Sequence, residues 1–212
     1  IYNKLSDSEK REFIREWQDL DEKAGDASES IQQLFYYYMF YLRATEDDVK
    51  TTTPGLRRYF SDNKSARLLK PELLDNLQII LNLWLVVTNH EVIDEEAWSS
   101  DKNILQALDV LKSYPNEFWK YPVVIYYLSH RTEPDFKSNF LRFLRKLLEE
   151  LLTKYLFTPT INAVKTDILK LDAEIIHSSV PKFDFRDVDM SQLSDKIKDP
   201  HRNAVRMLLK IL

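Results

Sequence analysis

The chain has 212 residues, of which 44% are hydrophobic and 30% are charged, with two glycines and no cysteine. This apolar content excludes a disordered chain, the formal charge of −4 excludes a generally basic binder of nucleic acid or membranes, and the missing thiols exclude disulfides and cysteine-based sites. Because strand-rich folds need glycine for hairpins and bulges whereas helices tolerate it poorly, so few glycines predict an all-α fold.

The first predicted helices follow recognisable start signals. Ser6 and Glu9 have the spacing of a capping box, in which each side chain bonds the backbone N–H of the other. The next helix, over about 28–46, has a centre that is apolar all round, so we expect it to be buried on most sides. Thr53 as N-cap and Pro54 at the first helical position predict a short helix after it.

Apolar residues spaced three and four apart predict the helices that follow. One begins at Pro71 and another is capped by Asp101. Residues 123–128 would suit a buried strand by composition, but we assign them to a helix because a lone strand would have no partner. Further helices are predicted over 134–157, 160–178 and 201–212.

These elements predict an irregular bundle of about seven to nine helices. In the longest of them, Glu150 and Lys154 are four residues apart, which favours an ion pair along the helix. Along the chain we expect a helical bundle at 1–178, an irregular arm or linker at 179–200 and, at 201–212, the start of a helix leading into a further C-terminal domain.

The two ends of the sequence indicate an interior piece of a larger protein. The chain opens at Ile1 rather than at a methionine, and it stops at Leu212 within an apolar-patterned run. A helix with an apolar stripe needs a surface to cover it, so we expect a neighbouring domain there. The alternative is that disordered segments flank a complete domain.

Several chemistries have no sequence support. Two isolated glycines cannot form a phosphate-binding loop or a dinucleotide fingerprint. The histidines lie too far apart for a zinc-binding helix motif, and no arginine precedes one at the spacing of helical ribonucleases. We therefore expect no catalytic residue, no metal site and no cofactor, and histidines that lie at the surface or at helix ends. The four histidines are His90, His130, His177 and His201.

Acidic residues gather in three places that would suit a divalent ion by ligand type alone. The stretches 46–48 and 91–96 are rich in carboxylates, and Asp184, Asp187 and Asp189 lie in the predicted arm. All three fall at helix ends or in irregular segments. We interpret them as solvated charges rather than as metal ligands.

Two groups of basic residues are candidates for nucleic-acid binding. The first is interleaved with Tyr59 and Phe60, and arginine beside aromatic rings suits contacts to phosphates and stacking on bases. The alternative is that both rings face the core and the arginines are merely solvated. The second group lies on the predicted 134–157 helix. The candidate residues are Arg57, Arg58, Lys64 and Arg67 in the first group, and Arg142 and Arg145 in the second.

Three stretches, taken in order, resemble a known family. They are an aromatic helix ending at 41–44 with 56–60 shortly after it, then 118–122, then 200–209. Together they resemble the helical middle region of GmrSD-like proteins, the type IV restriction systems that attack modified phage DNA. Those proteins join an N-terminal ParB-like domain, which carries a D-G-Q-Q-R motif, to a C-terminal HNH-type nuclease domain.

The resemblance implies a non-catalytic helical region that acts in phage defence in the bacterial cytoplasm. It implies as partners the flanking domains of the same polypeptide and DNA, with no membrane. The chain departs from the family in having neither D-G-Q-Q-R nor an E-H-I-x-P nuclease signature, so no catalytic role carries over. The alternative is a helical protein-interaction module unrelated to DNA. A helical enzyme, a third possibility, would need buried ionisable residues that converge in a pocket.

Overall fold

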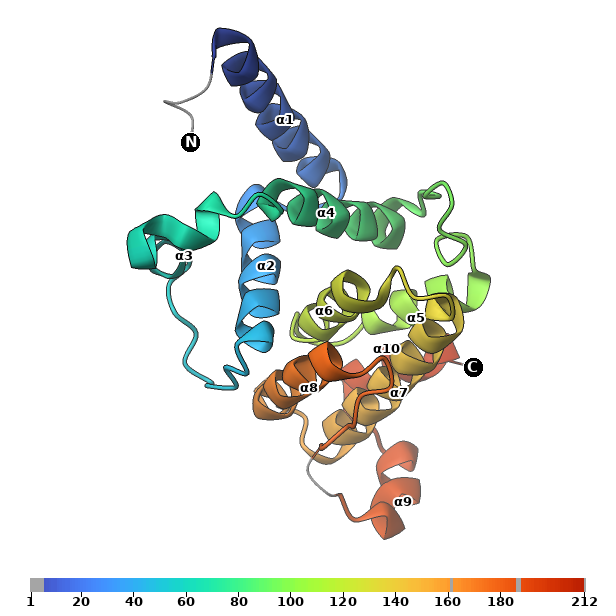
Figure 1. Ribbon diagram of the computed structural model, residues 1–212. Helices are drawn as coiled ribbons and strands as arrows, with labels where there is room; N and C mark the ends of the chain where they lie inside the picture. The colour runs from blue at the N-terminus through green and yellow to red at the C-terminus, as the bar shows by residue number, and fades with distance from the viewer. Residues whose placement is uncertain (1–5, 161, 186–187, 212) are drawn as a thin grey trace.

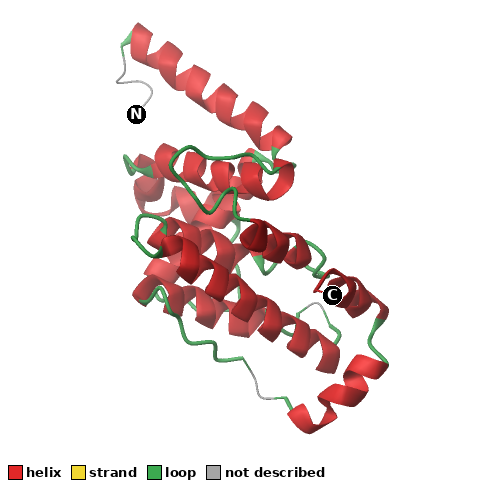
Figure 2. Cartoon of the chain, turned by 90° about the vertical axis from the view of Figure 1, so that its right-hand side faces the viewer, coloured by secondary structure: helices red, strands yellow, loops and turns green. Residues whose placement is uncertain are grey.

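The computed structural model describes residues 6–160, 162–185 and 188–211, and in these ranges every regular element is a helix (Figures 1 and 2). The all-α prediction is confirmed, although the described residues form ten α-helices rather than seven to nine. Ile1, Asp187 and Leu212 lie outside the described residues.

The α-helices are α1 (Asp7–Asp26), α2 (Ile31–Thr45), α3 (Leu56–Ser65), α4 (Leu73–Asn89), α5 (Lys102–Leu111), α6 (Lys120–His130), α7 (Phe136–Phe157), α8 (Lys165–His177), α9 (Leu193–Lys198) and α10 (Arg202–Ile211), with 3-10 turns η2 (Ala66–Leu69) and η3 (Met190–Gln192).

The residues at the helix starts can be compared with the predicted caps. The capping box is confirmed at α1, where the backbone N–H of Ser6 donates to Glu9 Oε2 at 2.7 Å. Asp101 caps α5 as expected, accepting from the backbone N–H of Asn103 at 2.9 Å. The prediction of Thr53 as the cap of α3 is wrong, because Gly55 occupies the N-cap position and supplies no side-chain bond.

The additional helix, α9, lies in the segment 179–200, for which we expect irregular structure. Irregular backbone does follow α8, but Asp189 then caps η3, accepting from the backbone N–H of Ser191 at 3.1 Å. Helix α9 follows directly and is only six residues long. So short a helix spans fewer than two turns, which leaves too little apolar periodicity to reveal it in the sequence.

Helix α2 lies at the centre of the bundle, in contact with α1, α3, α4, α6 and α8 (Figure 1). Aromatic rings fill the space between α2, α4 and α6: Tyr37 lies 5.2 Å from Trp84, and Phe40 stacks on Tyr121 at 3.8 Å. Such ring pairs contribute about 0.5–1.5 kcal/mol each beyond the area that they bury. The prediction that this aromatic helix is buried on most sides is therefore confirmed.

The lower part of the bundle in Figure 1 is built on α7, which contacts α5, α6, α9 and α10. Its apolar stripe includes Phe136, Phe140 and Phe143, which pack against Tyr126 of α6. This packing also confirms the choice of helix over strand for 123–128, all of which lies within α6. The hydrophobic core is thus continuous from α2 through α6 to α7.

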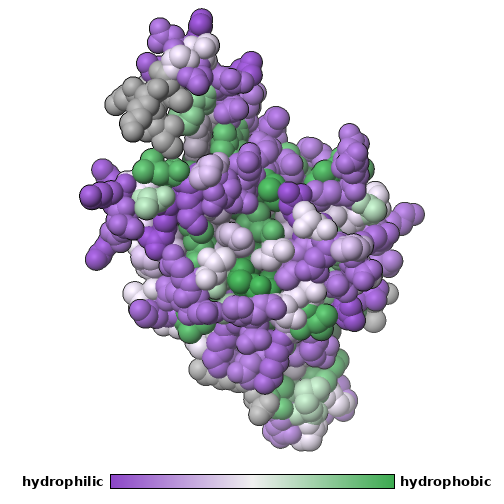
Figure 3. Space-filling view, in the orientation of Figure 1, coloured by the Kyte–Doolittle hydropathy of each residue, from purple (hydrophilic) through white to green (hydrophobic). Residues whose placement is uncertain are grey.

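The face of the molecule drawn in Figure 3 is mainly polar. Hydrophilic residues cover most of the face drawn in Figure 3, and hydrophobic residues show mainly in patches towards its middle. Helix α1 projects away from the rest of the molecule in Figures 1 and 2, and its side chains Phe13, Ile14 and Trp17 are only partly covered. Across the described ranges, no helix combines the length and apolar character needed to cross a membrane.

Among the described residues, four charged side chains are buried, which the sequence did not predict. Lys154 of α7 pairs with Asp167 of α8 at 3.5 Å, with about 7% and 2% of the side chains exposed. The predicted pair between Glu150 and Lys154 is therefore wrong, and Glu150 instead pairs with Lys146 at 2.9 Å. The two remaining buried charges are Arg43 in α2 and Asp172 in α8.

Asp172 carries a carboxyl group for which no hydrogen-bond donor is found among the described residues. Burial raises the pKa of this carboxyl well above its usual range, and the positive charge of Arg43 offsets only part of that effect. Because the folded-state pKa exceeds the unfolded one, the contribution of Asp172 to stability is full at low pH. It is lost as pH rises through the folded-state pKa.

The variant Asp172→Asn cannot ionise, so its free energy of unfolding should rise relative to the parent chain as pH increases from about 4, the usual pKa of aspartate. Urea unfolding of both chains at pH 4 and at pH 7 measures this difference. The prediction is contradicted if the difference in free energy of unfolding is the same at both pH values, or if the parent chain gains relative to the variant at pH 7. Either result would show that Arg43 stabilises the ionised carboxylate.

Left-handed backbone occurs at several residues other than glycine, as expected for a chain with so few glycines. His90 ends α4 with φ 58° and ψ 34°, and its backbone N–H donates to the carbonyl of Val86 at 3.0 Å. A side chain in this conformation costs roughly 1–2 kcal/mol, which glycine avoids.

His90→Gly should therefore raise the free energy of unfolding by about 1 kcal/mol, after allowance for the greater freedom of glycine in the unfolded chain. His90→Ala keeps the Cβ atom and serves as the matched control, for which we expect no gain. Chemical denaturation of the two variants and the parent chain measures both values. Equal stability of the two variants would contradict the backbone explanation.

Candidate nucleic-acid interface

The N-terminal half of α3 packs one side on α2 and turns the other side outward. Tyr59 and Phe60 are buried, and the ring of Phe60 meets that of Phe35 edge-on at 5.2 Å. Arg57 and Arg58, in the first turn of α3, are exposed. The alternative reading of this stretch, with both rings in the core, is therefore the one that the structure shows.

The exposed side of α3 and the neighbouring turn of α2 border an open, shallow hollow of about 530 Å³. We call it the α3 hollow. Its lining residues are Gln32, Tyr36, Gly55, Leu56, Arg57, Arg58 and Ser61. A second hollow of about 330 Å³ shares Gln32, Leu56 and Arg57 with it and extends towards Phe35 and Phe60. The lining of both hollows contains two cations and no carboxylate.

Arg57 and Arg58 bring two positive charges to the α3 hollow. Within the described part of the chain, neither guanidinium forms an ion pair. Tyr59, the aromatic neighbour that the sequence predicts for these arginines, is buried. The half-buried ring of Tyr36 lines the hollow beside them instead. This arrangement offers two hydrogen-bonding cations and a partly exposed ring at one place, which suits a phosphate with an adjoining planar group.

Lys64 and Arg67 lie apart from the α3 hollow. The regular helix stops before Lys64, which has left-handed backbone together with Asn63 and Ser65. Arg67 donates to both carboxylate oxygens of Glu46, at 3.1 and 3.3 Å, and its guanidinium lies 4.0 Å from the ring centroid of Tyr59. The charge of Arg67 is thus already neutralised within the protein.

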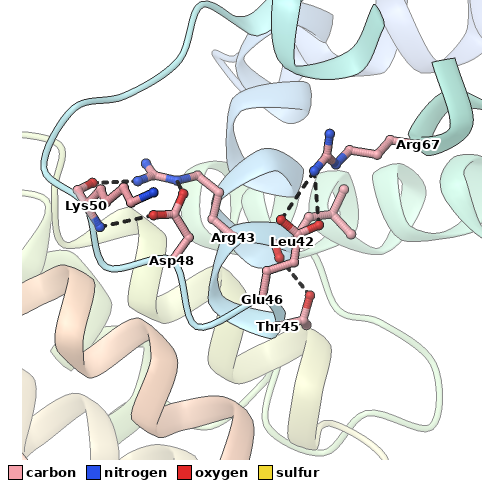
Figure 4. A network of polar contacts seen from close by, with 7 residues as sticks. All are labelled: Leu42, Arg43, Thr45, Glu46, Asp48, Lys50 and Arg67. Carbon is pink, nitrogen blue, oxygen red and sulfur yellow. Dashed lines mark hydrogen bonds and ion pairs between the residues drawn. The ribbon is translucent and has the colours of Figure 1, made fainter. Parts of the chain in front are cut away.

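The acidic stretch 46–48 supplies counter-ions to three different elements. Glu46 accepts from Arg67, and Asp48 accepts from Arg43 Nε at 2.9 Å (Figure 4). Asp47 contacts His177 Nε2 at 3.1 Å. Burial acts to raise the pKa of Asp48, but the hydrogen bonds from Arg43 and from the backbone of residue 50 hold that pKa below its usual range. Across the described residues, no group of three or more potential ligands is placed to hold a metal ion.

Arg43 closes the loop that follows α2. Its guanidinium also donates to the backbone carbonyl of Lys50, and the backbone N–H of Lys50 donates to Asp48 Oδ1 at 3.2 Å (Figure 4). The side chain is 1% exposed. This buried arginine therefore fixes the path of the chain as it leaves α2, on the way to Gly55 and the start of α3.

The second basic group lies on a different surface. Arg142 and Arg145 are exposed on α7, and Lys146 beside them is paired with Glu149 and Glu150 at 3.1 and 2.9 Å. Helix α3 packs on α2, whereas α7 packs on α5, α6, α9 and α10 (Figure 1). The structure therefore does not unite the two predicted basic groups in one continuous binding face.

Two further polar clusters are structural. His130, at the end of α6, is buried, with Nδ1 2.7 Å from Glu133 Oε1 and Nε2 2.7 Å from the carbonyl of Ile175. Glu96 accepts a hydrogen bond from Tyr127 at 2.6 Å and another from the indole of Trp98. Both clusters link helices or loops across the core, and neither brings ionisable groups together around the hollows described above.

Comparison with protein-family models, with curated proteins and with solved structures finds no match for this chain. Its function is therefore argued from its residues and their geometry.

The Arg43 and Arg67 ion pairs should differ sharply in their contribution to stability. Arg43→Met removes the buried anchor of the 46–50 loop and should lower the free energy of unfolding by about 2 kcal/mol or more. Arg67→Met breaks a pair whose side chains are 24% and 50% exposed, and it should cost at most about 1 kcal/mol.

Urea unfolding of both variants measures the two values. Arg67→Met is the matched control, because it removes the same charge from another arginine that pairs with the 46–48 stretch. Equal losses in the two variants would contradict the role that burial gives to Arg43.

Proposed function

We propose that this chain is a non-catalytic helical module that contacts DNA through the α3 hollow. The observation that carries the proposal is the pair of arginines, Arg57 and Arg58, beside a lining without carboxylates. The whole chain has a formal charge of −4, so this hollow is a local exception to its charge balance. A local cationic surface is what binding to a phosphate backbone requires, whatever the overall charge.

The wider role follows from the resemblance to GmrSD-like proteins. We propose that the module is the interdomain helical region of a restriction endonuclease acting in phage defence in the bacterial cytoplasm, where it positions the flanking domains of the same polypeptide. The three stretches named above support this proposal: residues 56–60 form the start of α3, and 200–209 include most of α10. The second group of candidate residues, Arg142 and Arg145, is not needed for it.

The geometry of the α3 hollow favours contact with the backbone over the reading of base sequence. Both arginines come from adjacent positions at the first turns of one short helix, and the hollow between α2 and α3 is open and shallow. Contacts to phosphates position a protein on DNA without specifying sequence. A strong dependence of affinity on salt and a weak dependence on sequence are therefore expected.

The double variant Arg57→Glu/Arg58→Glu should weaken binding to a 20-base-pair duplex at low salt by at least about tenfold, and should lower the slope of log affinity against log salt by about two. Fluorescence anisotropy over a salt series measures both quantities, with plain duplex and with duplex carrying modified cytosine. Because both side chains are exposed, the fold should be unaffected.

The matched control is Arg15→Glu/Lys102→Glu, which makes the same change in net charge at two exposed positions on α1 and α5. It should leave affinity nearly unchanged. Equal weakening in the two double variants would reduce the effect to overall charge. No affinity of the parent chain for either duplex at low salt would refute the proposed contact with DNA.

A further inference from the structure

Another hollow, away from α3, lies between α7 and the segment that follows α8. This segment crosses α7 in Figure 1. The ring of Phe183 lies 5.8 Å from that of Phe143. The hydroxyl of Tyr126 donates to the carbonyl of Ser179 at 2.7 Å and holds the start of the segment in place. Between the segment and α7 is a cavity of about 420 Å³, which we call the arm groove. Its lining includes Asn139, Arg142, Phe143, Val180, Pro181 and Phe183.

The interior of the arm groove is apolar. Phe143 and Pro181 are buried, Phe183 is half-buried, and Val180 is 62% exposed. A volume of this size lies at the lower end of the range of pockets that bury small ligands, about 300–1,000 Å³. An exposed branched side chain beside partly covered rings is a surface that gains stability when a further apolar group covers it.

One cation on the rim of the arm groove has no acidic partner. Arg142 donates to the side-chain oxygen of Asn139 and, among the described residues, forms no ion pair. Lys146, which also lines the groove, is paired with Glu149 and Glu150. The groove therefore presents one guanidinium whose charge a carboxylate from a partner would neutralise.

The arm also offers unpaired backbone. Residues 181–185 form neither helix nor turn, and within the described ranges their N–H and C=O groups form no backbone–backbone hydrogen bond. Backbone groups in such a segment are available to an extended chain laid beside it, which is how peptides add to exposed strands in other proteins. The arm and α7 thus supply backbone groups, an apolar cavity and a cation next to one another.

We propose that the arm groove binds an extended peptide segment that places an apolar side chain in the cavity and a carboxylate on Arg142. The proposal is independent of the α3 hollow, which uses other helices. DNA is a weaker candidate for this groove: its apolar interior offers nothing to a phosphate backbone, and Glu150 on its wall would repel one.

A selection from a displayed library of random dodecapeptides tests the proposal, with the intact chain as target and the Val180→Glu variant as counter-target. Enriched peptides should pair an aliphatic or aromatic residue with a nearby Asp or Glu. In fluorescence anisotropy with the synthesised peptides, Val180→Glu and Arg142→Glu should each weaken binding at least about tenfold.

Two controls match these changes outside the groove. Val92→Glu alters an equally exposed valine, and Arg145→Glu reverses the neighbouring exposed charge of α7 that does not line the groove. Both should leave peptide affinity within about twofold, since neither residue touches the groove.

Three outcomes would overturn the proposal. They are no enrichment above the counter-target, enriched peptides without carboxylates, and peptides that bind the Val180→Glu variant as well as the parent chain. Loss of duplex DNA binding on Arg142→Glu, without loss on Arg145→Glu, would assign the groove to nucleic acid instead.

Discussion

The aromatic contacts of α2 with α4 and α6 determine the direction in which the other side chains of α2 point. Tyr37 against Trp84 and Phe40 against Tyr121 leave little freedom for the helix to rotate, because each ring would lose its partner. In this orientation of α2, Gln32 is exposed and Tyr36 is half-buried, and both line the α3 hollow. The α2 side of the α3 hollow therefore depends on the packing that fixes this helix.

Charge placement reinforces that packing. Arg43 sits on the same buried face of α2 and ties down the loop that leads to α3, so the orientation of α2 and the position of α3 are set together. The cost of burying this arginine is offset by Asp48 and by a backbone carbonyl, whereas Asp172 in α8 has no such compensation among the described residues. Burial raises the pKa of Asp172 and the charge of Arg43 offsets part of that effect, which gives the centre of the bundle its expected dependence on pH.

The sequence was sufficient to predict the fold class and most helices, because these depend on local patterns. Few glycines, the Ser6–Glu9 capping box and the cap at Asp101 all act within one turn of chain. Helix α9 was missed because six residues carry little periodicity. The cap of α3 does not follow from the sequence, because Thr53 and Gly55 rank about equally as N-caps and the structure uses Gly55.

The candidate site was only partly predictable, since its electrostatics depend on contacts between distant residues. Arg57 and Arg58 were identified from the sequence, but Tyr36, their aromatic neighbour, belongs to another helix. Arg67 appeared equivalent to them until the fold brought Glu46 beside it, 21 residues away in the sequence. Such pairings depend on the path of the loop between α2 and α3, which no local pattern specifies.

The location of the DNA contact is the central claim of this account. It is tested most directly by two-dimensional amide NMR of the isotope-labelled chain during titration with a 12-base-pair duplex at low salt. The account predicts shifts concentrated in residues 32–36 and 55–61, around the α3 hollow, with little change at 139–146 in α7. Shifts concentrated on α7 or α10, with α2 and α3 unaffected, would contradict it.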